Sequence, residues 1–295
     1  MRVTAVVAAF AVLTVGEIGL FFWLKDADIA ERRADALLRE EAFASAAGLY
    51  QRALRRQPSR PELLLAFSRA LVGSGRFAEA RVMVARVLAL APADMEARQL
   101  SLELARRAND RAAVSDAARA ILATHPKSPD ARRELARALA ALGRSEEAEG
   151  QYRDLIASRP SEVSARVELA ALLQAKGDTE GAMESLREAL AASPKDPSVQ
   201  RGLADLSAAS GRFADAAELY QRYLTRAPDD RSARLQLAEA LSALKVFDRA
   251  AAEYRAVLKQ SPDDYDARIK LARVLSWSER YGESIEEYRR ALGEP

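Results

Sequence analysis

The chain has 295 residues, 49% of them apolar and 30% charged, and its basic and acidic side chains nearly cancel to a net charge of +2. Because nucleic-acid binding usually needs a clustered basic surface, this balance argues against a nucleic-acid partner. The chain lacks cysteine, which excludes disulfides, thiolate nucleophiles and cysteine-based zinc sites, and its one histidine, His125, cannot hold a metal alone. We therefore expect neither a metal nor a cofactor.

The first predicted element is an apolar segment at residues 3–24, in which Glu17 is the one charged residue. As a helix it would span about 33 Å, enough for a hydrocarbon core of about 30 Å. A cleaved secretory signal normally has a shorter apolar region followed by a small-x-small site. We therefore expect residues 1–26 to form an uncleaved single-pass membrane anchor. Because acidic residues inside a membrane often mark a contact, Glu17 is a candidate contact for a membrane partner.

The flanking charges do not decide the orientation of this anchor. Arg2 and the free amine lie on one side, and Lys25, Arg32 and Arg33 lie on the other. The positive-inside rule leans toward cytoplasmic repeats, but long domains cross the membrane largely regardless of charge. Both orientations stay open. We expect a bacterial inner-membrane protein and prefer a periplasmic location for the part after residue 26.

Beyond the anchor, prolines recur at an unbroken interval of 34 residues: Pro58, Pro92, Pro126, Pro160, Pro194, Pro228 and Pro262. Small or short residues lie 12 places before each proline (Ala46, Ala80, Val114, Ala148, Ala182, Ala216 and Ala250) and, in most units, 24 places before it. Small residues let two helix axes approach closely. Tyrosines or other fillers lie eight places before the proline, where we expect core packing rather than ligand contacts.

A left-handed turn is expected 17 places before each proline, because four glycines and an asparagine share that place: Gly75, Gly143, Gly177, Gly211 and Asn109. Each unit is therefore predicted to be a helix, a tight turn, a second helix and a proline that ends it.

These residues resemble the tetratricopeptide repeat family. The stretch 211–228, GRFADAAELYQRYLTRAP, is similar to the second helix of that repeat, and the first helices carry its leucine followed by a small residue, as in Leu203-Ala204. The resemblance implies an all-α fold, a right-handed superhelical solenoid of about eight helix-turn-helix repeats after the N-terminal transmembrane helix. Its predicted units are 27–60, 61–94, 95–128, 129–162, 163–196, 197–230, 231–264 and 265–295. The third departs from the pattern at Leu102, Arg111 and Val114, so its register or packing is open.

In such a solenoid the first helices line a concave face. The candidate groove residues predicted there are Arg69, Arg133, Arg137, Glu168, Arg201, Asp205, Glu239, Arg273 and Trp277. Small residues between them leave room for an extended peptide or a helix, and the charges would set its register. We therefore expect a protein partner in this groove.

The last unit carries two further hints. Residues 267–292, ARIKLARVLSWSERYGESIEEYRRAL, resemble repeats of bacterial envelope proteins for exopolysaccharide export, in which LSW and a following YxE stretch recur. Its outer side has no predicted neighbour, and Val274, Trp277, Ile285 and Leu292 are expected to lie near it. Two occupants stay open there, a second copy of the chain or a further part of a longer parent protein.

No phosphate-binding glycine loop, nucleophile elbow or other catalytic constellation is present in the sequence. We therefore expect a non-enzymatic, membrane-anchored scaffold that mediates protein–protein interaction in a bacterial envelope complex, with exopolysaccharide secretion or assembly as one setting. The alternative is a cytoplasmic-facing regulatory subunit or adaptor of a membrane enzyme or protease.

Overall fold

The computed structural model describes residues 27–293, which form helices joined by turns and contain no strand. A first helix covers residues 27–39. The helices that follow are α2 (Phe43–Leu54), α3 (Pro61–Gly73), α4 (Phe77–Leu90), α5 (Met95–Arg107), α6 (Arg111–Thr124), α7 (Pro129–Ala141), α8 (Ser145–Ser158), α9 (Val163–Ala175), α10 (Thr179–Ala192), α11 (Pro197–Ala209), α12 (Phe213–Leu224), α13 (Arg231–Ala243), α14 (Phe247–Gln260), α15 (Tyr265–Trp277) and α16 (Tyr281–Leu292).

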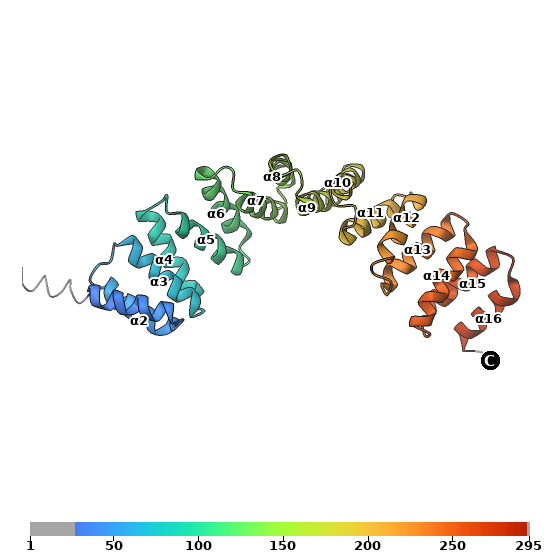
Figure 1. The fold of residues 1–295 in the computed structure, drawn as a ribbon, viewed down its shortest axis with the longest axis horizontal. Helices are drawn as coiled ribbons and strands as arrows, with labels where there is room; N and C mark the ends of the chain where they lie inside the picture. Colours follow the sequence, from blue (N-terminus) through green and yellow to red (C-terminus); the bar gives the residue numbers. More distant parts are fainter. Residues whose placement is uncertain (1–26, 294–295) are drawn as a thin grey trace, which may run out of the picture. The chain divides into compact units, whose positions relative to one another are not determined.

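The chain divides into two compact units, of which the first ends at Arg144 and the second begins at Ser145. In the first, each helix from α2 to α7 packs against the next one along the chain. In the second, the same holds from α8 to α16, and α11 also contacts α13 directly (Figure 1). Each unit is therefore a stack of sequentially packed helices, and the boundary between the units falls between the two helices of the fourth predicted repeat.

The predicted core positions are buried. The residues 12 places before each proline, Ala46 to Ala250, are at most 4% exposed. Ser68 and the alanines 24 places before the proline are at most 2% exposed, so paired helices come close at both places. Tyr50, Tyr152, Tyr220 and Tyr254 fill the space beside them and are at most 3% exposed. The interpretation of the tyrosines as packing residues is confirmed.

A left-handed residue ends the first helix of every described repeat. Gly75, Gly143, Gly177 and Gly211 have φ between 74° and 84°, and Asn109 has φ 54°. Glu41, Lys245 and Glu279 adopt the same conformation in the remaining repeats although they carry a Cβ. The turn is therefore a requirement of the repeat geometry, which these three residues meet at a steric cost.

The third repeat keeps its register despite the departures in its sequence. Its helices α5 and α6 have the same lengths as α7 and α8. Val114 replaces the alanine and is 4% exposed, while Leu102 is half-buried against a cluster that includes Ala105 and Val114. The departures therefore change which side chains fill the contact, and they do not shift the helices.

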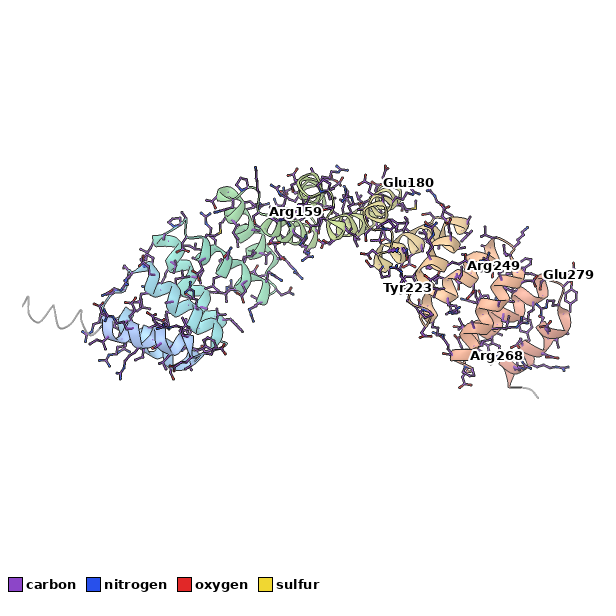
Figure 2. The ribbon with its side chains drawn as sticks, in the orientation of Figure 1. Arg159, Glu180, Tyr223, Arg249, Arg268 and Glu279 are labelled. Atoms are coloured by element: carbon purple, nitrogen blue, oxygen red, sulfur yellow. The ribbon has the colours of Figure 1, made fainter. Side chains whose placement is uncertain are left out.

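A periodic hydrogen bond ties the turn after six of the seven periodic prolines, Pro92 to Pro262, to the helix that follows. The residue six places after the proline donates to the proline carbonyl oxygen, at 2.5–2.8 Å for Arg98, Arg132, Arg166, Gln200 and Arg234, and also for Arg268, which is labelled in Figure 2. We call this contact the proline latch. Arg166, Arg234 and Arg268 also pair with Glu188, Glu253 and Glu287 on the second helix of the repeat. Sequence analysis missed this contact.

At the last repeat, Trp277, Ile285 and Leu292 are 51–67% exposed, as expected. The expectation for Val274 was wrong, since it is 1% exposed. Val274 occupies the helical position of Leu206 and Ala240, which face the core in the two preceding repeats.

The predicted anchor, residues 1–26, and Glu17 within it lie outside the described residues. Within residues 27–293, no helix combines the length and apolar character needed to cross a bilayer.

Candidate partner-binding groove

The structure brings five of the predicted groove residues together on three first helices of the second unit. Arg201 and Asp205 lie on α11, Glu239 on α13, and Arg273 and Trp277 on α15. They line two neighbouring hollows that share Glu239. The first hollow, about 400 Å³, lies between α11 and α13, and the second, about 320 Å³, lies between α13 and α15. Because of the shared wall, the hollows form one surface, which we call the α11–α13–α15 groove.

The arginine of the first hollow is neutralised from within the protein. Arg201 forms an ion pair with Asp230, the N-cap of α13, and lies 3.6 Å from Asp205. Its guanidinium also covers the ring of Tyr223, 5.6 Å from the ring centroid. The first hollow therefore presents a fixed network of paired charges.

The floor of the first hollow is a buried tyrosine that is bonded to an acid. The Tyr220 hydroxyl donates to Asp205 at 2.5 Å. Burial, and then this hydrogen bond, raise the pKa of Tyr220 well above its usual value. The same pairing occurs in the first repeat between Tyr50 and Asp35 at 2.6 Å. Asp205 therefore has a structural partner in addition to its place in the groove.

The second hollow differs from the first in the partner of its acid and in the character of its floor. Its acid, Glu239, bonds to Lys270 on the next first helix. The floor is formed by Val274 and Tyr254, which are 1% and 2% exposed, and burial raises the pKa of Tyr254 to about 12. Trp277 forms one rim, 51% exposed, with its ring centroid 5.9 Å from that of Phe247. This hollow therefore combines an apolar floor with a mixed-charge rim.

The other four predicted groove residues line neither hollow. Arg69 on α3 pairs with Glu96 of the following repeat, and Arg137 lies 3.5 Å from Glu134, all in the first unit. Arg133 is also on α7 in the first unit, and Glu168 is on α9 in the second. Their assignment as partner contacts stays a prediction.

Several lining residues were missed, although the helical spacing could have found them. Lys270 lies three residues before Arg273, which lies four before Trp277. Ser232, Gln236 and Glu239 are likewise spaced four and three residues apart. Such intervals place side chains on one face of a helix. Over the part of the chain that is described, no cluster of three histidines or carboxylates could hold a metal ion.

A stack of two-helix repeats with a polar groove on its first helices defines an all-α repeat protein of the interaction type. Three family models described as "Tetratricopeptide repeat" match residues 37–106 and 173–240, residues 8–61 and 133–197, and residues 231–274. Together they span most of the chain, which therefore belongs to the tetratricopeptide repeat family. This fold typically serves protein interaction rather than catalysis. A model of the bacterial transcriptional activator domain also matches residues 80–162.

Solved structures agree on the fold. YrrB, described as a tetratricopeptide repeat protein with an unusual peptide-binding site, is 18% identical with a TM-score of 0.54, covering 61% of this chain and 92% of its own. MamA is 15% identical with a TM-score of 0.51, covering 56% of this chain and 90% of its own. A structure of Naa15/Naa10 bound to HypK-THB is 17% identical with a TM-score of 0.60, covering 90% of this chain and 42% of the matched chain. Comparison with curated protein sequences finds no significant match.

Proposed function

We propose that this protein is a membrane-anchored scaffold that holds an extended segment of a partner protein in the α11–α13–α15 groove. The observation that carries the proposal is the shared wall at Glu239, which joins two hollows on three successive first helices. Membership of the tetratricopeptide repeat family supports it. The peptide-binding site described for YrrB, a protein of the same fold, is consistent with it.

The dimensions suit an extended chain. Packed helices lie about 8–10 Å apart, and a peptide in the extended polyproline II conformation advances about 3.1 Å per residue with three residues per turn. Side chains three residues apart then lie on one face of the peptide and could enter successive hollows. Small side chains at Ala208, Ala209 and Ala243 keep the groove open between the charged residues.

We further propose that residues 3–24 anchor the scaffold in a bacterial inner membrane, with the repeats on the periplasmic side. An envelope complex for exopolysaccharide secretion or assembly is the setting that the resemblance of residues 267–292 supports. This part of the proposal rests on the sequence, on the apolar segment and on that resemblance.

The groove can be tested by selecting peptides against the full chain from a random display library and blocking the groove sterically. Ala209→Phe and Ala243→Phe would fill the first and second hollows, and Ala191→Phe places the same ring on the exposed face of α10 as a control. We expect each plug to weaken the selected peptides about tenfold or more, and the control to bind as the parent does. Peptides that bind all three variants equally would place the binding surface elsewhere.

A further inference from the structure

We propose that the second hollow selects an acidic side chain next to an aromatic one in the partner segment, with the carboxylate on Arg273 and the aromatic ring on Trp277. The inference rests on the groove function proposed above and names the chemistry that one part of the groove recognises. It is carried by three differences between the second hollow and the rest of the repeat array.

The first difference is that the charge of Arg273 is not compensated by an ion pair within the described residues. Glu239 is the acid that lines this hollow, and its carboxylate is bonded to Lys270. Across residues 27–293, no carboxylate forms an ion pair with Arg273. Arg201, the arginine of the first hollow, pairs with Asp230 instead. An incoming carboxylate would therefore find an available guanidinium in the second hollow but a compensated one in the first. A guanidinium–carboxylate contact is among the stronger hydrogen-bonded pairs.

The second difference is Trp277, which breaks the repeat pattern. The corresponding last positions of α9, α11 and α13 are Ala175, Ala209 and Ala243. Because those repeats pack with alanine, the fold does not need an indole at this place. The ring is half exposed, and Phe247 supports it at 5.9 Å between centroids and a tilt of 43°. A supported, half-exposed indole offers an apolar platform at low entropic cost.

The third difference concerns the tyrosine at the floor. Tyr220 and Tyr50 donate to Asp205 and Asp35, the acids at one repeat position. Glu239 occupies this position in the seventh repeat, but Lys270 engages it, and Tyr254 interacts with Ser242 instead. Unlike the floor of the first hollow, the buried floor of the second is therefore not bonded to an acid of the described chain.

The selectivity can be measured with defined peptides on the full chain. The probes are eight-residue, acetylated and amidated peptides of glycine and serine with a central Glu-Phe, Lys-Phe or Glu-Ser pair, labelled for fluorescence anisotropy. Blocked termini leave the glutamate as the one carboxylate. A Trp23→Phe background makes Trp277 the only tryptophan, so its emission reports occupancy of this hollow.

We expect the Glu-Phe peptide to bind about tenfold more tightly than either of the others. The Lys-Phe peptide lacks the carboxylate for Arg273, and the Glu-Ser peptide lacks the aromatic ring for Trp277. Arg273→Glu should reverse the order of Glu-Phe and Lys-Phe, and Trp277→Ala should weaken both by a similar factor. Arg249→Glu, the same charge change on the exposed face of α14, serves as the control (Figure 2). Equal affinity for Glu-Phe and Lys-Phe, or an equal loss in Arg249→Glu and Arg273→Glu, would overturn the inference.

The two proposals can fail separately. If library-selected peptides are lost with Ala209→Phe and Ala243→Phe while Glu-Phe shows no preference, the groove binds a partner but not by this chemistry. If the plugs have no effect on any peptide, the groove itself is not the site, and the inference about its second hollow fails with it.

Discussion

The Arg234 guanidinium donates a hydrogen bond of 2.7 Å to the carbonyl oxygen of Pro228, six residues earlier in the chain. The same guanidinium contacts Glu253 on the next helix at 2.7 Å. One side chain thus joins the turn that ends a repeat to both helices of the repeat that follows. Because the proline that sets the period supplies the acceptor, the latch recurs with the same spacing.

Removing this latch should destabilise the solenoid locally. Arg234→Ala deletes both contacts, and we expect a loss of about 2 kcal/mol because hydrogen bonds to charged groups are worth about 1.5–3 kcal/mol. Arg234→Gln should lose about half as much, since Gln200 makes the equivalent bond to Pro194 at 2.8 Å. Urea unfolding followed by circular dichroism measures both, with Arg249→Ala as the exposed control. Equal losses for alanine and glutamine would show that the carbonyl contact contributes nothing.

The left-handed turns predict opposite effects for two substitutions at one repeat position. Lys245→Gly should stabilise the protein by about 0.5–1 kcal/mol, because it relieves the Cβ clash at φ 61°. The gain is smaller than the full clash energy, since glycine also raises the entropy of the unfolded chain. Gly211→Ala should cost about 1–2 kcal/mol at φ 74°, where a Cβ would meet no neighbour and only the backbone is strained. Thermal melts of both variants decide the matter, and a stabilised Gly211→Ala would contradict the turn geometry.

The close helix contact at the alanine position predicts an overpacking penalty. Ala216 is fully buried, so Ala216→Leu should lower stability by about 1–3 kcal/mol. Ala191→Leu makes the same change at an exposed position of α10 and should lie within about 0.5 kcal/mol of the parent. The measurement is the urea midpoint of each variant. A neutral Ala216→Leu would mean that the paired helices are not held at this distance.

The N-terminal segment predicts membrane retention. We expect the full protein to stay in the membrane fraction through alkaline carbonate washing and its intact mass to include residues 1–26. A mature mass that begins beyond residue 24 would identify a cleaved signal instead. Protease treatment of spheroplasts tests the orientation, since periplasmic repeats would be digested from outside and cytoplasmic repeats would be protected.

The repeat geometry could be predicted from the sequence because its determinants are local. The proline interval and the glycines at one position reflect steric rules that act on a few neighbouring residues. Even the non-glycine turn residues, such as Lys245, follow from the period. The burial of Val274 could have been predicted from the same period, because Leu206 and Ala240, which occupy its position in the two preceding repeats, are buried. The error came from treating the last repeat as different from the others.

The chemistry of the groove was less predictable. The first helices and their charged face were identified, but not which charges cancel. Arg201 is neutralised by Asp230, the N-cap of the next first helix, and Glu239 by Lys270 of the next repeat, which lie 29 and 31 positions further along the chain. Whether long side chains meet across such a boundary depends on rotamers and on the packing of neighbouring helices. The proline latch was missed for a related reason, since its acceptor is a backbone carbonyl that leaves no mark in the sequence.

Glu239 lines both hollows, so its carboxylate contributes to the electric field in each. A ligand group that drew Lys270 away from this carboxylate would change the field in both hollows at once. Occupation of one hollow would then alter the affinity of the other, and by thermodynamic reciprocity the factor would be the same in both directions. The binding free energy of a partner that fills both hollows would therefore differ from the sum of the free energies for the separate hollows. Glu239→Gln would remove this coupling while leaving both hollows in place.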